Sequence, residues 1–335
     1  MVLRKTTAVI AALAVAVLAI IIAFDAFRSK PLESSFFSMN TLVTAEVEGG
    51  EAENCLAEIK STLENLDYNI LSRTAKGSAV YKLNQSGEAL LDKQTAEYFS
   101  ALADISRQSG GAFDFTLGAV SDLWDFGGTP SMPDEAELAR ALSHSGFEKI
   151  SIGDSKISLN DKKAVIDFGA SGKGIALDSI KACLEANETK RAVVSVGGSV
   201  LLYGEGEFAV GIRNPRGGSG SSIATLGITE GCVSTSGSYE QYFEQNGKRY
   251  HHIIDPETGY PVDNGLISVT VISESGLLSD ALSTACFVLG IEEGSRLAEH
   301  YGAKVIFITE DNLIYTEDAV RDIITVTDKN YKFGG

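Results

Sequence analysis

The chain has 335 residues and a formal net charge of −17 at pH 7, and hydrophobic residues make up 44% of it. That is enough apolar material for one large domain or two smaller ones with a buried core. A protein that follows a nucleic-acid backbone needs a basic stripe, which this sequence lacks, so we exclude nucleic acid as a partner. A polyanionic ligand would need local positive charge or a metal ion.

The first thirty residues are typical of an export signal. Arg4 and Lys5 precede an uninterrupted apolar run at 8–24, and further charged residues follow it directly. The run is short for a membrane span but longer than most cleaved signal peptides, and no cleavage site stands out. We therefore expect 1–30 to be a signal anchor and linker, with the domain at 31–335 outside the cytoplasm and held at the cell membrane. A cleaved peptide is the alternative.

Periodicity predicts strands and helices in alternation after the linker. Residues 36–47 are typical of a strand that small and polar residues interrupt at 38–41. Apolar positions at helical spacing predict an amphipathic helix at 51–71. A second helix is predicted at 94–109, where two glycines end it.

Asp114 lies in the aromatic-rich stretch GGAFDFT that follows the second helix. If it is buried, its carboxylate needs hydrogen-bond donors, so it either caps the next helix or holds a ligand group, and capping is the simpler interpretation. The one tryptophan, Trp124, stands in the same aromatic cluster, and we expect it in the core.

A glycine-rich turn follows in the middle of the chain. A helix is predicted at 133–145 and a hairpin of two strands at 156–159 and 164–168. The hairpin leads into DFGASGKG and then a helix at 175–186. A strand, a glycine turn and a helix start together point backbone amides and Lys173 at an anion, although the Walker spacing is absent. A turn that only caps a helix would use the same residues.

The C-terminal half contributes many short elements, and the sequence predicts strands at 192–196, 208–212, 223–228, 233–236, 304–308 and 313–315 and a helix at 293–301. Short strands, hairpins and interspersed helices predict a mixed α+β fold with largely antiparallel sheets and flanking helices.

His252 stands between a short β-rich run and the turn Asp-Pro-Glu-Thr-Gly at 255–259. The unperturbed pKa of histidine lies near neutral pH, so His252 can take a proton from a hydroxyl nucleophile. A histidine that only braces the turn or fills the core is the alternative, and the residues alone leave both open.

Asp280 and Thr284 are four residues apart on a helix predicted to begin near Leu278. This spacing puts the carboxylate and the hydroxyl on one face near the positive end of the helix. Mg²⁺ prefers such oxygen ligands together with phosphate oxygens of a substrate. In the simpler interpretation Asp280 is an N-terminal helix acid and Thr284 a packing residue.

The four cysteines, at positions 55, 183, 232 and 286, form no metal-binding pattern, so we expect no structural zinc. Cys286 is predicted in the core. In an exported protein two of the four can pair, and the sequence does not say which.

The order of the motifs resembles the ApbE family of FAD:protein FMN transferases along nearly the whole exported part. The resemblance rests on SMNTLVTAEV, LSRTAKGSAVYKLN, GGAFDFTLGAVSDLWDFG, VIDFGASGKGIALD, TSGSYEQYFEQNGKRYHHIIDPETGYPV and SDALSTACFVLG. It implies an ApbE-like fold and a Mg²⁺-dependent enzyme that cleaves FAD. Such an enzyme passes FMN to a Ser or Thr hydroxyl of a target protein through a phosphoester bond and releases AMP.

The resemblance also implies roles for individual residues. Mg²⁺ would be held by the Asp280 carboxylate, the Thr284 hydroxyl and the main-chain carbonyl of Ala170. His252 would be the general base, and Lys173 would stabilise the developing charge. The FAD contacts would fall on Met39, Ala112, Asp114, Asp167, Lys173, His252 and Ile253.

Two positions depart from the family pattern. Thr74 stands where many members have tyrosine, and Ser171 where an apolar residue is usual. Both leave the metal ligands intact but can change the affinity for FAD. Two other functions stay open: a Mg²⁺-dependent FAD pyrophosphatase that makes FMN and AMP, and an exported flavin-binding protein without turnover, which intact Asp280, Thr284 and Lys173 argue against.

Overall fold

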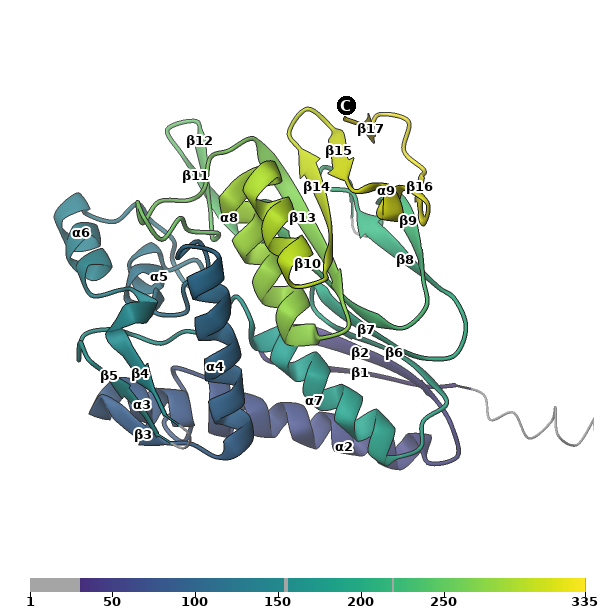
Figure 1. Cartoon of the computed structure of the whole chain (residues 1–335), viewed down its shortest axis with the longest axis horizontal. Coiled ribbons are helices and arrows are strands. Elements are labelled where there is room, and N and C mark those ends of the chain that lie inside the picture. The colour runs from purple at the N-terminus through teal and green to yellow at the C-terminus, as the bar shows by residue number, and fades with distance from the viewer. Residues whose placement is uncertain (1–30, 154–155, 219, 335) are drawn as a thin grey trace, which may run out of the picture.

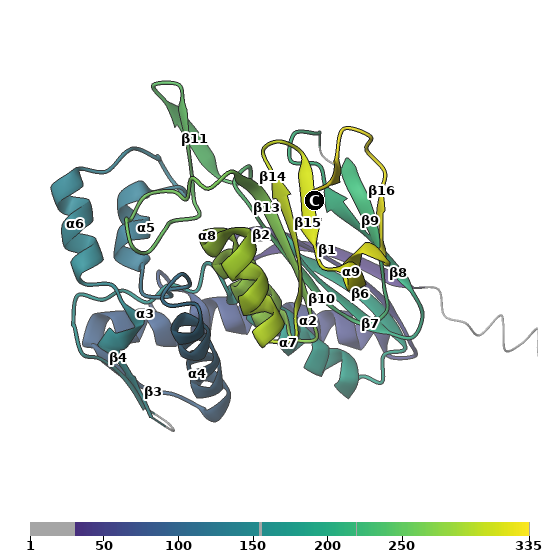
Figure 2. The same ribbon diagram turned by 45° about the horizontal axis from the view of Figure 1, so that its top comes forward.

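The computed structural model describes residues 31–153, 156–218 and 220–334. A long mixed sheet carries the large helices on one side and a smaller sheet on the other (Figure 2). Among the described strands, all pairs are antiparallel except that of β15 with β17. The prediction of an α+β fold with largely antiparallel sheets and flanking helices is confirmed.

The main sheet has nine strands, in the order β1 (Leu32–Ser38), β2 (Thr41–Glu48), β6 (Arg191–Val196), β7 (Ser199–Gly204), β10 (Gly231–Gly237), β13 (Leu266–Ser273), β14 (Lys304–Thr309), β15 (Leu313–Thr316) and β17 (Lys332–Phe333). β2 shows the expected alternation, because Val43 and Ala45 are buried under the helices while Leu42 and Thr44 face away. β13 is buried along nearly its whole length, since both of its faces are covered.

Three smaller sheets complete the strands: β16 (Ile324–Val326), β9 (Ser222–Ile228) and β8 (Phe208–Arg213); β3 (Glu88–Leu90), β5 (Lys156–Leu159) and β4 (Ile150–Ile152); and β11 (Tyr242–Gln245) with β12 (Lys248–His251). β8, β9 and β16 close a second apolar core against the main sheet. The hairpin of β11 and β12 projects from the molecule (Figure 2).

Helices α2 (Ala52–Asn65), α7 (Gly172–Ala186) and α8 (Gly276–His300) cover the other face of the main sheet (Figure 1). α2 continues into η1 (Leu66–Leu71) and buries the stripe that its periodicity predicts. α8 is broken at Gly290, where φ is 79°, so the two predicted helices in this part are its two arms.

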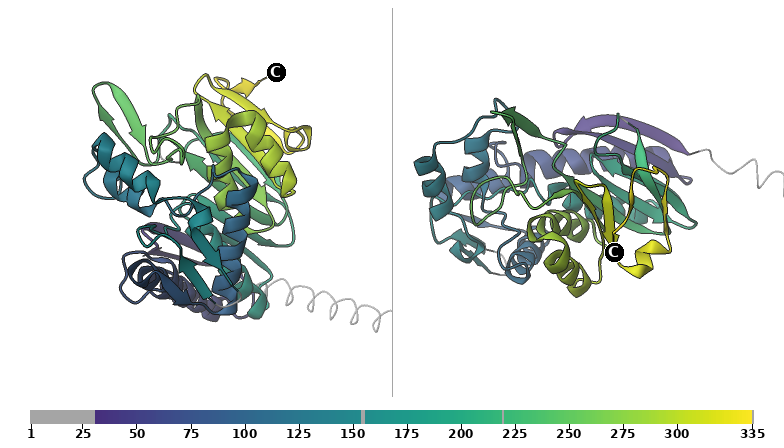
Figure 3. Two further views of the ribbon diagram at one scale, coloured as in Figure 1. Left: turned by 60° about the vertical axis from the view of Figure 1, so that its left-hand side comes forward. Right: turned by 90° about the horizontal axis from the view of Figure 1, so that it is seen from above.

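A lobe beside the main sheet holds the remaining helices apart from α9 (Asp318–Arg321) (Figure 3). They are α3 (Ala79–Ser86), α4 (Lys93–Gln108), α5 (Gly118–Trp124), α6 (Glu135–Ser143) and η2 (Phe147–Lys149). Trp124 is 0% exposed, as predicted, and its indole N–H donates to the carbonyl of Gly259 at 2.8 Å. The lobe is thereby tied to the turn that follows β12.

Two predicted strands differ from the structure. Residues 36–47 are two strands, β1 and β2, because Met39 and Asn40 turn with φ of 49° and 58°. The hairpin of 156–159 with 164–168 is wrong: β5 pairs with β3 and β4, and 164–168 makes one bridge, from Val165 to Leu117.

The predicted anchor at 1–30 lies outside the described residues. Within the described part, no helix is both long and apolar enough to cross a bilayer. The four cysteines are buried free thiols, so the possible pairing of two of them is not present, and Cys286 lies in the core as predicted.

Candidate active site

The site is organised by the crossing of α7 and α8 at their first turns. Gly174 and Gly276 meet there with no room for a side chain, since a Cβ on Gly174 would lie 2.2 Å from the carbonyl oxygen of Gly276. Each helix also supplies an acid to the other. Asp280 accepts the Gly174 N–H at 2.9 Å, and Asp178 accepts the N–H groups of Gly276 and Leu277 at 2.6 and 2.9 Å. The two helix starts therefore cap one another.

Asp280 is a buried carboxylate with neutral partners. Asp280 is 4% exposed, and its second carboxylate oxygen accepts a hydrogen bond from the Ser199 hydroxyl at 3.1 Å. No Lys, Arg or His nitrogen of the described residues lies within ion-pairing distance of it. Buried carboxylates are normally paired with a cation or bind a metal, so this one has the properties of a cation ligand.

Thr284 lies one turn further along the same face of α8. Its hydroxyl is 3.1 Å from that of Ser236 on β10, which is also 2.7 Å from the Ser283 hydroxyl. Both predicted side-chain ligands are thus fixed by hydroxyl groups of the neighbouring strands. The alternative of Asp280 as an N-terminal helix acid does not fit, because α8 begins at Gly276 with no acid in its first turn and the Asp280 carboxylate accepts the Gly174 N–H of α7.

The segment 164–173 brings Ala170 and Lys173 to the start of α7. The Ser171 and Gly172 N–H groups both donate to the Phe168 carbonyl, which forms the turn into the helix. Lys173 is in the first helical turn, half-buried. The Ser171 hydroxyl is buried and has no hydrogen-bond partner among the described residues.

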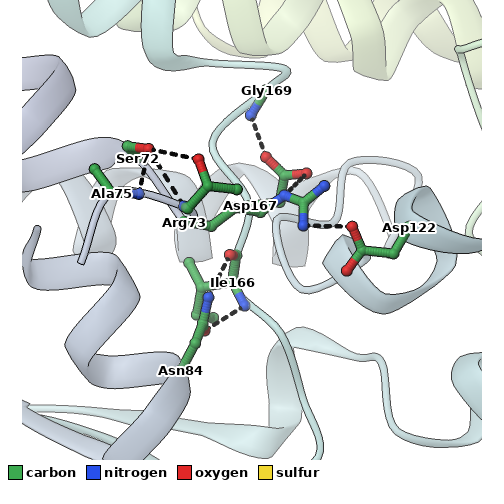
Figure 4. A network of polar contacts seen from close by, with 9 residues as sticks. Ser72, Arg73, Ala75, Asn84, Asp122, Ile166, Asp167 and Gly169 are labelled. Atoms are coloured by element: carbon green, nitrogen blue, oxygen red, sulfur yellow. Dashed lines mark hydrogen bonds and ion pairs between the residues drawn. The ribbon is translucent and has the colours of Figure 1, made fainter. Parts of the chain in front are cut away.

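Side chains from the lobe clamp the backbone just before this turn (Figure 4). The Asn84 amide donates to the Ile166 carbonyl at 2.9 Å and accepts the Ile166 N–H at 2.8 Å. Arg73 binds Asp167 at 3.0 Å and Asp122 at 2.6 Å. The other Asp167 oxygen accepts the Gly169 N–H at 2.8 Å. The predicted FAD residue Asp167 is therefore held in place by a neighbouring arginine.

His252 directly follows β12 and belongs to the same electrostatic neighbourhood as Lys173. Burial lowers the pKa of His252 to about 4, and the Lys173 charge adds to this. Its Nδ1 lies 3.3 Å from the Gln241 carbonyl oxygen. A carbonyl oxygen accepts a hydrogen bond but cannot donate one, so Nδ1 carries the hydrogen and Nε2 is left as an acceptor. Burial also raises the pKa of Glu240, an effect that Lys173 and Arg213 oppose.

The remaining predicted FAD residues lie on loops around these groups. Met39, in the turn from β1 to β2, reaches Gly172 at the start of α7. Ala112 and Asp114 are in the loop after α4, whose Phe115 carbonyl accepts the Asp167 N–H at 2.8 Å. Ile253 is 3% exposed and part of the main core, and its N–H donates to His251 Nδ1 while its carbonyl accepts the Val262 N–H, so the structure does not present it to a ligand.

Asp114 does not cap α5, so the capping interpretation is wrong. The residue at the start of that helix is Leu117, and no side chain caps it. Instead one Asp114 oxygen accepts both the N–H and the hydroxyl of Thr116, at 2.8 and 2.7 Å. Burial raises the pKa of Asp114 to about 6. A buried carboxyl whose pKa is raised in this way is compatible with the other interpretation, in which Asp114 holds a ligand group.

Residues 39–307 match the sequence profile of the ApbE family. This chain belongs to the ApbE family. Its sequence is 32% identical over 305 residues to the FAD:protein FMN transferase of Treponema pallidum, with 84% of each chain covered. It is 30% identical to the Escherichia coli K12 protein of that name, over 82% of this chain and 83% of the other.

Solved ApbE structures have the same fold. The ApbE protein of Thermotoga maritima has a TM-score of 0.80 at 29% identity, covering 88% of this chain and 99% of that one. The apo form of the Pseudomonas stutzeri flavinyl transferase ApbE has a TM-score of 0.77 at 28% identity, covering 89% and 98%.

In this ApbE protein, several contacts of the site escaped the sequence analysis. Arg73 stands in a motif that the family resemblance used, yet its ion pair with Asp167 joins residues far apart in the sequence. The same holds for the hydrogen bonds made by Asn84, Asp178, Ser199, Ser236 and the Gln241 carbonyl, and for the charge interaction of Glu240 with Lys173. One signal in the sequence could have indicated the contact between the helices: Asp178, an acid in the predicted helix, stands four residues after Gly174.

Proposed function

We propose that this ApbE protein is a Mg²⁺-dependent FAD:protein FMN transferase. It would pass the FMN moiety of FAD to a Ser or Thr hydroxyl of a target protein and release AMP. The observation that carries the proposal is a buried carboxylate, Asp280, without a cationic partner among the described residues, next to a helix start that bears Lys173. The names of the relatives support the reaction.

The oxygen donors at this place suit Mg²⁺ rather than zinc. Asp280 would supply one carboxylate, Thr284 a hydroxyl and Ala170 its main-chain carbonyl, and a hard cation prefers such a set. The described residues contain no cluster of three or more His, Cys, Asp and Glu that would hold a metal, and this set has one member of that kind. When bound, Mg²⁺ supplies positive charge to the pyrophosphate that the acidic chain lacks.

The chain's own residues would position the reacting groups. The acceptor oxygen forms a bond to the phosphorus of the FMN phosphate, while the bond from that phosphorus to the oxygen of AMP breaks. The Lys173 ammonium would stabilise charge on the phosphate oxygens. The first turn of α7 adds its positive end.

His252 would accept the proton of the hydroxyl at Nε2. A pKa of about 4 keeps the imidazole neutral at pH 7, so it is always in the accepting form. It is also a weak base. We therefore expect the proton to move late, after the oxygen has begun to bond to phosphorus and its own acidity has risen.

We also propose that the protein is located at the outer face of the cell membrane. Support comes from the apolar run at 8–24 and its charged flanks. An extracytoplasmic enzyme would meet target proteins that are themselves exported.

The deciding experiment incubates residues 31–335 with FAD, Mg²⁺ and an extract of exported proteins from the same cells. AMP release is followed together with flavin fluorescence on a denaturing gel. A fluorescent band that carries FMN on a Ser or Thr, formed along with AMP, would support the transferase. AMP and free FMN without a labelled protein would replace it by the pyrophosphatase. Bound FAD without AMP would replace it by a binding protein.

A further inference from the structure

β8 is the open edge of the small sheet. The strand order is β16, β9, β8, and no described strand pairs with the other side of β8. The Gly227 N–H of β9 donates to the Ile323 carbonyl on the side of β16. Because hydrogen-bonding directions alternate along an antiparallel strand, the residues opposite Gly227 and Thr225 point their N–H and C=O groups away from β9. Those residues are Ala209 and Gly211.

A cavity of about 660 Å³ lies between this edge and the main sheet. Its walls include Val210 and Gly211 of β8, Thr41 and Leu42 of β2, and Thr235 of β10. On the main-sheet side the lining includes five hydroxyl side chains, those of Thr41, Thr44, Ser195, Thr235 and Thr270. The cavity is therefore suited to a peptide backbone with small polar side chains.

An exposed apolar pair forms the sheet surface next to the cavity. Phe37 and Leu42 are cross-strand neighbours in β1 and β2, and they are 73% and 58% exposed. Leu42 faces away from the helices, since Val43 points into the core beneath them. The main sheet thus offers uncovered apolar side chains alongside an unpaired strand edge.

The open edge ends at the active site. Arg213, the last residue of β8, lines the same cavity as Glu240. The positive charges of Arg213 and Lys173 both favour the ionised form of the Glu240 carboxyl, against the effect of burial on its pKa. Glu240 and Gln241 both line the cavity, and the Gln241 carbonyl is the partner of His252. A chain lying along β8 would therefore run toward the base and the lysine of the proposed reaction.

We propose that the acceptor protein is bound as an extended segment that adds to the open edge of β8 as a further strand. Ala209 and Gly211 would exchange main-chain hydrogen bonds with it, and its Ser or Thr would pass beyond Arg213 to His252. Proteins usually protect open strand edges, and strand addition is an established way to bind peptides. The inference rests on the proposed function, because it names how the protein acceptor of that reaction is held.

The probe for the test is a displayed library of fifteen-residue peptides with one central threonine in random surroundings. The full chain is supplied with FAD and Mg²⁺, and FMN-labelled members are recovered and sequenced. The most rapidly labelled peptide is then synthesised. Strand addition predicts that such a short segment suffices, so a chain that labels an exported protein but no library member would overturn the inference. AMP without any labelled peptide or protein would instead overturn the proposed function.

Changes on the enzyme then test the edge. Gly211→Pro removes an N–H that points away from β9, so the pairing inside the small sheet is kept. We expect kcat/KM for the peptide to fall at least about tenfold, with FAD affinity retained. Gly211→Ala is the matched control, because it keeps the N–H and its Cβ would make an ordinary contact with Ser222 at 3.4 Å. Equal kcat/KM for the proline variant and wild type would overturn the inference.

A change on the peptide tests the same contact without altering the enzyme. A series is made in which one backbone nitrogen at a time is methylated. An added strand exposes alternate N–H groups to β8, so the loss of kcat/KM should recur at every second residue on one side of the threonine. Losses without this two-residue period would overturn the inference even if the proline variant fails to fold.

Discussion

The two halves of the active site are held in place in different ways. Asp280 and Thr284 stand on α8, which crosses α7 in glycine contact and shares caps with it. Met39, Asp114, Asp167 and His252 lie on loops or at the end of a short hairpin. They are held by individual hydrogen bonds and ion pairs, such as those of Asp167 with Arg73 and of His252 with the Gln241 carbonyl.

The difference fits the roles that we propose for the two halves. A metal ligand must be fixed within a few tenths of an ångström, and helices packed backbone to backbone provide this. A site for FAD and for a protein hydroxyl must open and close, which loops permit. The helical half should therefore be sensitive to volume and charge, and the loop half to changes in rate, affinity and pH.

The largest effect is expected when the charge is removed from the helical half. Asp280→Asn keeps an amide oxygen that can accept a hydrogen bond from Gly174 or Ser199, but it removes the negative charge that would bind the proposed Mg²⁺. We expect at least about a thousandfold loss of Mg²⁺-dependent AMP release, of the size of several kcal/mol in transition-state stabilisation. Asp178→Asn is the control, since Asp178 caps α8 without belonging to the metal set. Full activity of Asp280→Asn in Mg²⁺ would remove Asp280 from the metal site.

A bulkier residue at the helix crossing should act on both fold and site. A Cβ on Gly174 would lie 2.2 Å from the Gly276 carbonyl oxygen, so Gly174→Ala must push α7 and α8 apart. We expect a loss of about 3 kcal/mol in the free energy of unfolding, measured in urea, together with weakened Mg²⁺ binding. Gly172→Ala is the matched variant, because its Cβ would have 3.7 Å to the nearest atom. Equal stability of the two variants would contradict the close crossing.

In the loop half, His252→Ala should slow transfer about a hundredfold and change FAD affinity little. The proposed base titrates at about 4. The rate of the wild type should therefore stay level from pH 8 through the ordinary histidine range and fall only near pH 4 to 5. A rate that halves near pH 6.5 would show that the imidazole is not depressed in this way. Equal losses in FAD binding and rate would show that His252 binds FAD rather than acting as the base.

The same pKa also bears on stability. The folded pKa of His252 is lower than the unfolded one, so the unfolded chain takes up the proton first as the pH falls. The contribution of neutral His252 is complete above about pH 6.5 and is lost as the pH falls toward 4. The His252→Ala variant should lack this part of the acid destabilisation.

Local pattern was sufficient for most elements and for placing Asp280 and Thr284 on one helix. The spacing of Asp280 and Thr284 predicts a shared helix face, and the structure has both on α8. The predicted pairing of 156–159 with 164–168 is wrong because β5 forms its hairpin with the preceding strand, β4, and pairs on its other side with β3, which lies far upstream in the sequence. Reciprocal capping and the Gly174–Gly276 contact join residues about a hundred positions apart, and no local periodicity carries such information.

Arg73 offers a gentler change in the loop half. Arg73→Lys keeps the positive charge, but a lysine ammonium cannot bind Asp167 and Asp122 at the same time through separate nitrogens, as the arginine guanidinium does. We expect the KM for FAD to rise about tenfold. Because the pair is partly exposed, the free energy of unfolding should change by less than about 1 kcal/mol. An unchanged KM would mean that the segment from Ile166 to Gly169 is held well enough by Asn84 alone.

The last change is at Asp114, and the sign of its effect on stability tells whether the loop half carries strain. Burial raises the pKa of Asp114 from 3.8 to about 6, so the folded state prefers the protonated acid. Its contribution to stability is complete below about pH 4 and is lost as the pH rises through 6. Asp114→Asn cannot ionise. It should match wild type in urea unfolding at pH 4 and exceed it by about 1 to 2 kcal/mol at pH 8. If the variant at pH 8 is more stable but has a higher KM for FAD, the Asp114 carboxylate contributes to FAD binding and lowers the stability of the fold. In the helical half, by contrast, Asp280 both caps α7 and is the proposed metal ligand. No stability gain at pH 8 would mean that Asp114 is as well satisfied as Asp280, and the contrast between the halves would then lie in backbone rigidity alone.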